Sequence, residues 1–151
     1  LRRLEASGSF RQQLCQDPDT LTDDMQDFFR LHKNSKLDKR EFMTPQRERF
    51  FTDMAVELGS RGQFKLAFLE LEGIRVASCI YFDYLGAYLL YNSGYDPNYS
   101  HLSIGLINKA LAIRQAIDAG KDSFDFLRGD ERYKYALGGE DRRVFRMTLR
   151  R

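Results

Sequence analysis

Two stretches in the first third of the chain carry the apolar spacing of amphipathic helices. Each begins with a capping residue followed by proline, Asp17-Pro18 in the first and Thr44-Pro45 in the second, and such a pair favours the start of a helix. Behind each pair, apolar residues recur every few positions on one helix face. These positions are Leu21, Met25, Phe28 and His32, and then Phe50, Phe51, Met54 and Leu58. The sequence therefore predicts two consecutive helices.

From Phe64 onward the pattern changes to that of β-strands. Phe64–Leu71 and Ile74–Phe82 are joined by Glu72-Gly73, a tight-turn pair. A third strand, Tyr88–Tyr91, follows a break at Leu85-Gly86. Three consecutive strands with short connections predict an antiparallel meander.

The rest of the chain predicts a third helix and several shorter elements. The third helix runs between Ser103, as its cap, and Gly120, and its predicted apolar stripe is Leu106, Ala110, Ile113 and Ile117. The shorter elements are strands at Leu1–Glu5, Phe124–Leu127 and Val144–Leu149 and a brief helix at Glu131–Leu137. We therefore expect an α/β fold, with a mixed, mostly antiparallel sheet and helices on both faces.

Length and composition fit one globular domain spanning residues 1–151. The chain has 151 residues, 42% of them hydrophobic and 13% aromatic, which is enough for one sizeable core. It starts without methionine in a strand-like run, so we expect that sequence upstream of Leu1 has been removed.

Charge and cysteine content narrow the functional classes. A net charge of +2 gives no argument for nucleic-acid binding. Positive charge collects near the C-terminus and again at Lys33, Lys36, Lys39 and Arg40, and it forms either solvated faces or a landing site for an anionic donor. Cys15 and Cys79 lie far apart without metal-ligand spacing, so we expect no metal site and no disulfide framework. The sequence has no apolar run long enough to span a bilayer, and a cytoplasmic location is expected.

Several stretches, taken together and in order, resemble the GNAT acyltransferase superfamily. They narrow the resemblance to the GNAT-6 or CelD/BioF2-like branch, which is related to the FemAB-type aminoacyl transferases. The matching stretches are Phe28–His32, Gly73–Ala77, Tyr91–Pro97, Ser103–Leu106, and Phe124–Glu131 with Tyr133-Lys134. The resemblance covers almost the whole chain and implies an acyl-CoA N-acyltransferase fold. Because proteins of this branch often carry two such domains in tandem, it also implies that this chain is the C-terminal part of a longer protein with an N-terminal sister domain.

The resemblance also implies a site for acyl-CoA or acetyl-CoA as co-substrate. In the superfamily, the donor pyrophosphate rests on backbone N–H groups where the helix after the fourth strand begins, which here corresponds to Ser103, Ile104 and Gly105. The usual signature is Gln or Arg followed by two spaced glycines, and only Gly105 matches it in His101–Ile107. This departure leaves the donor open. In the alternative interpretation, Ser103 is a plain N-cap and Gly105 permits close packing on the sheet.

The richest polar run, Arg128–Lys134, follows a short strand and offers groups for acyl transfer. Asp130 or Glu131 can act as base, and Tyr133 can protonate the leaving group. Arg128 or Lys134 can hold a carboxylate, a phosphate or the oxyanion. By resemblance alone, Tyr133-Lys134 matches a Tyr-Lys pair near the reaction centre of FemAB-like enzymes.

A structural interpretation of these residues stays open beside the catalytic one. Asp130 and Glu131 can cap the brief helix while Lys134 is solvated. A second cluster, Tyr95 and Asp96, is a candidate for substrate binding, but Asp-Pro is also a common turn pair. His32, on an apolar helix face, is more typical of a core histidine.

Three functions follow from the resemblance. The first is N-acyl transfer to the amine of a small-molecule or sugar acceptor, in polysaccharide or envelope biosynthesis. The second is a FemAB-like transfer from aminoacyl-tRNA, for which the basic C-terminus would supply phosphate contacts. The third is a non-catalytic half that shapes the cleft of a two-domain enzyme.

Overall fold

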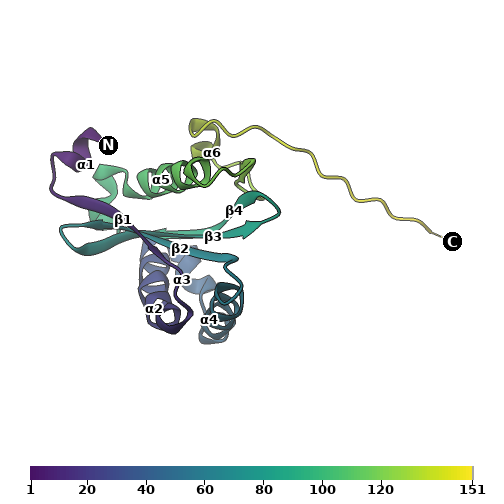
Figure 1. Ribbon diagram of the computed structural model, residues 1–151, viewed down its shortest axis with the longest axis horizontal. Coiled ribbons are helices and arrows are strands. Elements are labelled where there is room, and N and C mark those ends of the chain that lie inside the picture. The colour runs from purple at the N-terminus through teal and green to yellow at the C-terminus, as the bar shows by residue number, and fades with distance from the viewer. Residues whose placement is uncertain (151) are drawn as a thin grey trace.

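One five-stranded sheet organises the fold, with its strands in chain order from β1 to β5 (Figure 1). The computed structural model describes residues 1–150. Neighbouring strands are antiparallel except β4 and β5, which are parallel. The strands are β1 (Phe10–Cys15), β2 (Phe64–Leu71), β3 (Ile74–Tyr84), β4 (Ala87–Tyr95) and β5 (Ser123–Asp125). The predicted α/β class, mixed sheet and antiparallel meander are confirmed.

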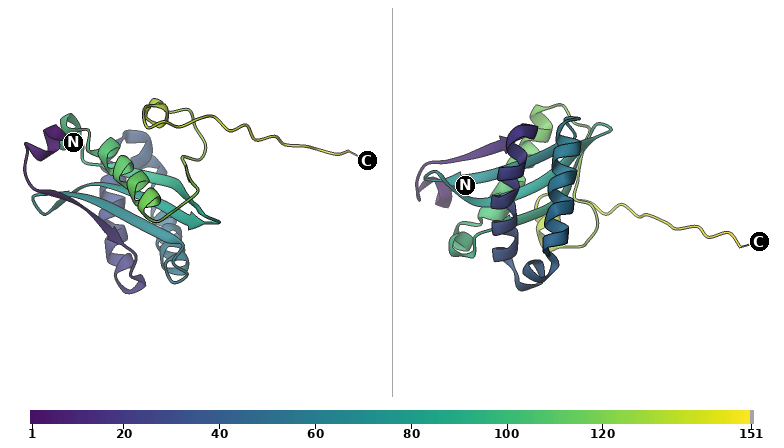
Figure 2. Two further views of the ribbon diagram at one scale, coloured as in Figure 1. Left: turned by 45° about the horizontal axis from the view of Figure 1, so that its top comes forward. Right: turned by 90° about the horizontal axis from the view of Figure 1, so that it is seen from below.

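Three helices cover one face of this sheet and one long helix covers the other. On the first face, α2 (Pro18–Ser35) and α4 (Pro45–Gly59) lie side by side, with the short α3 (Leu37–Phe42) between them in the chain (Figures 1 and 2). On the opposite face lies α5 (Ile104–Asp118). Both predicted caps form, because the side chain of Asp17 accepts from the Asp19 N–H and that of Thr44 from the Arg47 N–H.

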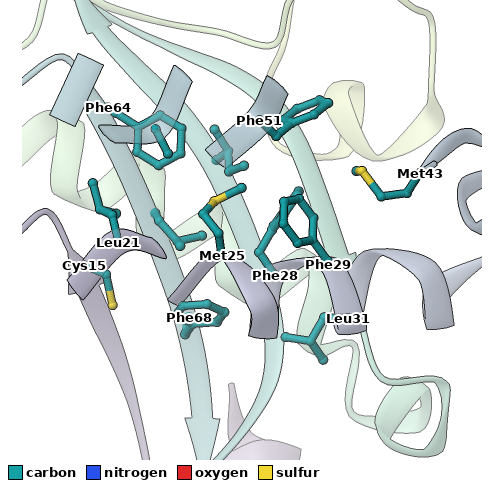
Figure 3. Close-up of a cluster of buried hydrophobic side chains, with 13 residues drawn as sticks. Cys15, Leu21, Met25, Phe28, Phe29, Leu31, Met43, Phe51, Phe64 and Phe68 are labelled. Atoms are coloured by element: carbon teal, nitrogen blue, oxygen red, sulfur yellow. The ribbon is translucent and has the colours of Figure 1, made fainter. Parts of the chain in front are cut away.

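The larger core lies between the sheet and the α2–α4 pair (Figure 3). Leu21, Met25 and Phe28 of α2 are fully buried there, as their helical spacing predicted. Phe51 of α4 is 2% exposed, whereas its predicted partner Phe50 is 59% exposed. Phe50 is the neighbour of Phe51 on the helix, about 100° further round, so the two cannot share one face.

A polar cluster between α5 and the sheet fixes the position of this helix. Asn108 is 1% exposed, and its side-chain N–H donates to the Ala67 carbonyl of β2 at 3.2 Å. The Gln12 amide of β1 donates to the Asn108 side chain at 2.6 Å and accepts from Gln115 at 2.7 Å. Gln115 also accepts a hydrogen bond from the Tyr81 hydroxyl of β3. Since buried amides are stable only when their hydrogen bonds are made, this cluster sets the rotation of α5.

The predicted apolar stripe of α5 is therefore wrong. Leu106 and Ile117 are 39% and 70% exposed, and Ala110 is exposed as well. The buried positions are Ile104, Ile107, Asn108, Lys109, Ala112 and Ala116. The helix is apolar around most of its circumference, so periodicity alone did not identify the inward face.

Both ends of the chain differ from the prediction. The first residues form a short helix, α1 (Arg2–Glu5), because Leu1 and Leu4 have helical spacing and Leu4 alone is buried. The first strand is β1, which the sequence reading missed. Val144–Leu149 forms no strand, and its four apolar side chains are 82% to 93% exposed. The alternation of apolar and polar residues in this segment is typical of a strand. A strand also needs a hydrogen-bonded partner strand, and none is present for it within residues 1–150.

Two short helical segments complete the chain beside α5. They are the 3-10 helix η1 (Pro97–Leu102), which was not predicted, and α6 (Arg132–Ala136), which was predicted. Across residues 1–150, none of the helices combines the length and the apolar character that crossing a bilayer requires.

Candidate functional site

The candidate site lies where β4 and β5 separate. The two parallel strands pair only from Ala87↔Ser123 to Leu89↔Asp125. β5 then ends, while β4 continues to Tyr95. Over its second half, β4 therefore presents an edge that no strand within residues 1–150 covers. Such an edge offers backbone N–H and C=O groups to a ligand.

A β-bulge lies on this open half of β4. Ile80 of β3 pairs with Asn92, but Tyr81 pairs with Leu90, so Tyr91 is the extra residue. Bulges alter the direction of backbone groups and are frequent next to active sites. Directly after the bulge, the Ser93 N–H donates to the Asn92 side chain at 2.8 Å, and the Ser93 carbonyl accepts from the Lys39 ammonium. The backbone N–H and the backbone carbonyl of Ser93 are thus both hydrogen-bonded to side chains.

Helix α2 crosses β4 at Gly94, and this contact requires glycine. A Cβ at Gly94 would lie 2.4 Å from the His32 backbone nitrogen and 2.5 Å from the Leu31 carbonyl carbon. The close approach places His32, which is 1% exposed, beside the open edge of β4. Burial, and then the charge of Lys39, lower the pKa of His32 from 6.5 to about 4. His32 is therefore a neutral, buried histidine at physiological pH.

The start of α5 lies next to the same edge and carries free backbone donors. Ser103 has a left-handed backbone (φ 57°), and its side chain makes no capping hydrogen bond, so the predicted Ser103 side-chain cap is wrong. Its carbonyl accepts the Leu106 and Ile107 N–H groups, both at 3.0 Å. Within residues 1–150, no acceptor is present for the N–H groups of Ile104 and Gly105. These two donors, at the positive end of a 15-residue helix, can hold an anionic oxygen.

Tyr95 and Gly105, expected in separate parts of the site, lie together. A Cβ at Gly105 would lie 3.4 Å from Tyr95 Cδ1 and 3.9 Å from the Lys109 Nζ atom. Asp96 has a structural contact instead, because its side chain accepts from the Asn98 N–H at 3.0 Å and caps η1. The turn interpretation of Asp96 thus describes its contacts in this structure.

Lys134 is not a solvated residue. It is 6% exposed, and its Nζ donates to the carbonyls of Arg128 at 2.7 Å and Gly129 at 3.1 Å. It also forms an ion pair with Glu131 at 2.8 Å. Lys134 therefore closes the loop after β5 from within, and its ammonium is occupied by these contacts. Glu131 stands at the first position before α6 but its side chain does not cap the helix.

The remaining residues of the polar run differ in exposure. Arg128 and Asp130 are exposed, and the hydrogen bond with Lys134 lowers the pKa of Glu131. An open pocket of about 690 Å³ lies on the outer side of this loop, and Arg128 and Lys134 are among its lining residues. Arg128 thus faces a space where a substrate group can bind.

Tyr133 is half-buried against the aromatic cluster on the α5 face of the sheet. Its ring packs edge to face on Phe126, with 6.2 Å between ring centroids. Burial, and then the negative charge of Glu131, raise its pKa to about 12. The hydroxyl therefore keeps its proton at neutral pH, as a general acid must.

Two further lysines lie at this site, of which the sequence had indicated only Lys39, as part of a basic cluster. Lys109 of α5 is 7% exposed, and its Nζ donates to the Gly105 carbonyl at 3.1 Å and lies 4.8 Å from the centre of the Tyr133 ring. Lys39 of α3 donates to Ser93 of β4, as described above. A lysine on the buried face of a helix indicates a functional site, but Lys109 could be recognised as buried only after the inward face of α5 was known. Lys39 belongs to the basic cluster noted in the sequence, but its place at β4 could not be predicted, because α3 was not predicted.

Metal-ligand side chains do not gather at this site. Over the described part of the chain, His, Cys, Asp and Glu side chains form no group of three or more that could hold a metal ion. The free cysteines Cys15 and Cys79 are both buried, and burial raises the pKa of each thiol to about 12. Neither is a thiolate at neutral pH.

Solved structures share this fold at low sequence identity. An aminoglycoside acetyltransferase from an uncultured soil metagenomic sample, in complex with sisomicin, matches with a TM-score of 0.63 and 18% identity, over 93% of this chain and 97% of that one. An aminoglycoside N-acetyltransferase in complex with a bisubstrate analogue containing CoA matches with a TM-score of 0.65 and 13% identity, over 95% and 99%. Glucosamine-6-phosphate N-acetyltransferase from Arabidopsis thaliana matches with a TM-score of 0.61 and 12% identity, over 93% of this chain and 98% of that one.

Sequence comparison identifies the family. No curated protein sequence matches the chain significantly. The family model described as "Acetyltransferase (GNAT) domain" matches residues 1–135, which is most of the chain. The chain therefore belongs to the acetyltransferase (GNAT) domain family, a family of acyltransferase enzymes.

Proposed function

We propose that this domain transfers an acyl group from acyl-CoA, or a similar thioester donor, to the amine of a small-molecule or sugar acceptor. One arrangement carries the proposal: the free N–H groups of Ile104 and Gly105 lie beside Tyr95 of β4, and Lys109, which contacts the Gly105 carbonyl, lies 4.8 Å from the ring centre of the protonated Tyr133. The N–H groups fit the phosphates of such a donor, and the hydroxyl fits a thiolate leaving group. The neighbours that bind CoA or amino sugars agree with this choice.

The chemistry needs one proton donor and one proton acceptor. The acceptor nitrogen forms a C–N bond with the thioester carbonyl carbon, and the C–S bond breaks. The leaving thiolate takes the Tyr133 proton, and the proton lost by the amine passes to a carboxylate. Of the two predicted bases, Glu131 is weakened by its ion pair with Lys134, which lowers its pKa. Asp130, which is exposed, is the better base.

Binding of the donor is tested by calorimetry with acetyl-CoA. Replacing Gly105 by phenylalanine should abolish binding, because a large side chain here meets Tyr95 and covers the helix start. Gly105→Ala is the matched control, since its Cβ makes only ordinary contacts of 3.4 Å and beyond. Failure of the unaltered full-length protein to bind acetyl-CoA would refute the CoA version of the proposal.

The role of Tyr133 is tested by kinetics. Tyr133→Phe keeps the packing against Phe126 and removes only the hydroxyl, so kcat should fall about 10²-fold or more while acetyl-CoA binding is unchanged. An unchanged kcat would exclude Tyr133 as the acid. Asp130→Asn should lower kcat more than Glu131→Gln, and the reverse order would exclude Asp130 as the base.

The finer assignments of the sequence reading remain proposals. They are the CelD/BioF2-like branch, a role in polysaccharide or envelope biosynthesis, and a sister domain N-terminal to this one. Transfer from aminoacyl-tRNA is the second candidate, and it is supported by the exposed arginines Arg142, Arg143, Arg146 and Arg150. Aminoacyl-tRNA affinity that falls steeply with salt would favour it. Full activity after Tyr133→Phe and Asp130→Asn in the longer protein would favour the non-catalytic role.

A further inference from the structure

Two lysines from opposite faces of the sheet reach the open end of β4: Lys39 donates to the Ser93 carbonyl, and Lys109 donates to the carbonyl of Gly105, which lies beside Tyr95. Lys39 comes from α3, on the face covered by α2 and α4, and Lys109 comes from α5 on the other face. They can approach each other because β5 ends at Asp125 and leaves this part of β4 uncovered. The charge of Lys109 acts on Lys39, and the exposed Lys36 adds a third positive charge.

Lys109 is buried and Lys39 is half-buried, and neither ammonium has a carboxylate partner. Within residues 1–150, no carboxylate oxygen lies within 4.0 Å of Lys39 Nζ or Lys109 Nζ. Lys109 donates to the Gly105 carbonyl and Lys39 to the Ser93 carbonyl, so each has only a neutral acceptor. The nearest carboxylates have other contacts.

Those carboxylates are Asp38 and Glu131. Asp38 accepts from the Lys39 backbone N–H at 2.9 Å, and Glu131 is paired with Lys134 at 2.8 Å. On the other side of Lys39 lies His32, which is neutral, and the buried His32 Nδ1 has no hydrogen-bond partner among the described residues. Asp38 and Glu131 thus offset part of the positive charge from a distance, but neither forms an ion pair with Lys39 or Lys109.

Such an arrangement is unfavourable in the absence of a ligand. Buried lysines are rare unless paired, and two like charges in a partly dry site repel each other. Burial lowers the pKa of Lys109, and burial together with the charges of Lys109 and Lys36 lowers that of Lys39 to about 8. An anion between the two ammonium groups would remove the repulsion and satisfy their remaining donors.

We propose that Lys39 and Lys109 bind an anionic oxygen group, a carboxylate or a phosphate, of a substrate in the transfer cleft. The inference rests on the proposed function, because it places the anion beside Tyr133 and Gly105. Two substrates can supply the anion. One is an acceptor that carries an acidic group next to its amine, such as a phosphorylated amino sugar, and the other is the phosphate portion of the donor.

The test measures binding by calorimetry with inorganic phosphate as the first probe. Lys39→Met and Lys109→Met should each weaken phosphate binding at least fivefold, because each removes one of two facing charges. Lys65→Met is the matched control, since Lys65 lies on β2, with β3 between it and β4, and contacts Gln16. Equal phosphate affinity in all four proteins, or no phosphate binding at all, would overturn the proposal.

Thermal unfolding separates a binding role from a structural one. Methionine matches the length of lysine without its charge, so Lys109→Met should keep or raise Tm in phosphate-free buffer. If both methionine variants instead lower Tm by several degrees, the lysines support the fold and the proposal fails.

Competition then identifies the source of the anion. Glucosamine 6-phosphate that displaces phosphate, when glucosamine does not, assigns the pair to the acceptor. CoA that displaces phosphate, when pantetheine does not, assigns it to the donor. Phosphate binding that depends on both lysines without any CoA binding would support this site and refute the CoA-dependent function. CoA binding that neither lysine substitution changes would support the CoA-dependent function and refute this anion site.

Discussion

His32 makes the stability of this protein sensitive to pH in a predictable direction. The side chain is 1% exposed, and its pKa is about 4, compared with an ordinary value of 6.5. Burial is the first cause, and the adjacent positive charge of Lys39 is the second. In the unfolded chain neither cause acts, so the unfolded state takes up a proton at a higher pH than the folded state does.

The sign and the size follow from this difference. Above pH 6.5 the imidazole is neutral in both states, and the contribution of His32 to stability is fully present. As the pH falls from 6.5 towards 4, the unfolded chain binds a proton that the folded protein does not, and stability is lost. At 1.36 kcal/mol per pKa unit the total loss is about 3 kcal/mol, of which about 2 kcal/mol is lost between pH 7 and pH 5.

Urea unfolding at pH 7 and pH 5 measures the effect. Carboxylates also titrate in this range, so the relevant quantity is the change between the two pH values in the unaltered protein minus that in His32→Gln, which cannot titrate. We expect a difference of about 2 kcal/mol. His101, the second of the two histidines and an exposed one, provides the control: His101→Gln should behave as the unaltered protein. Identical pH dependence in His32→Gln and the unaltered protein would refute the reasoning.

Three further substitutions test contacts that position the site, each by urea unfolding. Gly94→Ala should cost about 2 kcal/mol, because its Cβ would lie 2.4 Å from the backbone of α2, whereas the matched Gly105→Ala should cost much less; equal costs would contradict the close crossing. Asn108→Leu should cost about 2 kcal/mol by leaving buried partners without hydrogen bonds, and a neutral effect would mean that the polar cluster does not hold α5. Arg75→Met removes the ion pair at 2.8 Å to Asp24, which is 9% exposed, and should cost about 2 kcal/mol or more; a negligible loss would contradict the structural role of this ion pair.

Caps and turns in the sequence correctly predicted the starts of two helices and one hairpin, because these features depend on only a few neighbouring residues. The Asp17-Pro18 and Thr44-Pro45 pairs fixed the starts of α2 and α4, because both the cap and the proline act within one turn. The turn at Glu72-Gly73 fixed the β2–β3 hairpin, since both residues have positive φ, as a tight turn of this kind requires.

The sequence predictions were wrong where contacts with distant segments decide the structure. The alternation in Val144–Leu149 is typical of a strand, but pairing depends on another segment, and none within residues 1–150 is present. In α5, nearly every face is apolar, so the inward face was decided by the hydrogen bonds of Asn108 and Gln115 to β1, β2 and β3. That rotation in turn buries Lys109.

The sequence by itself determined the fold class, the meander, the main helices and, by resemblance, the acyltransferase family. These features depend on periodicity, caps and turns, which act over a few residues. Only the tertiary structure decided how the site is assembled: β5 ends early, α2 crosses at Gly94, Lys39 reaches Ser93 of β4, and Lys109 lies beside Gly105 and Tyr133. These residues are distant in the chain, and their charges and burial depend on each other, so no local pattern carries that information.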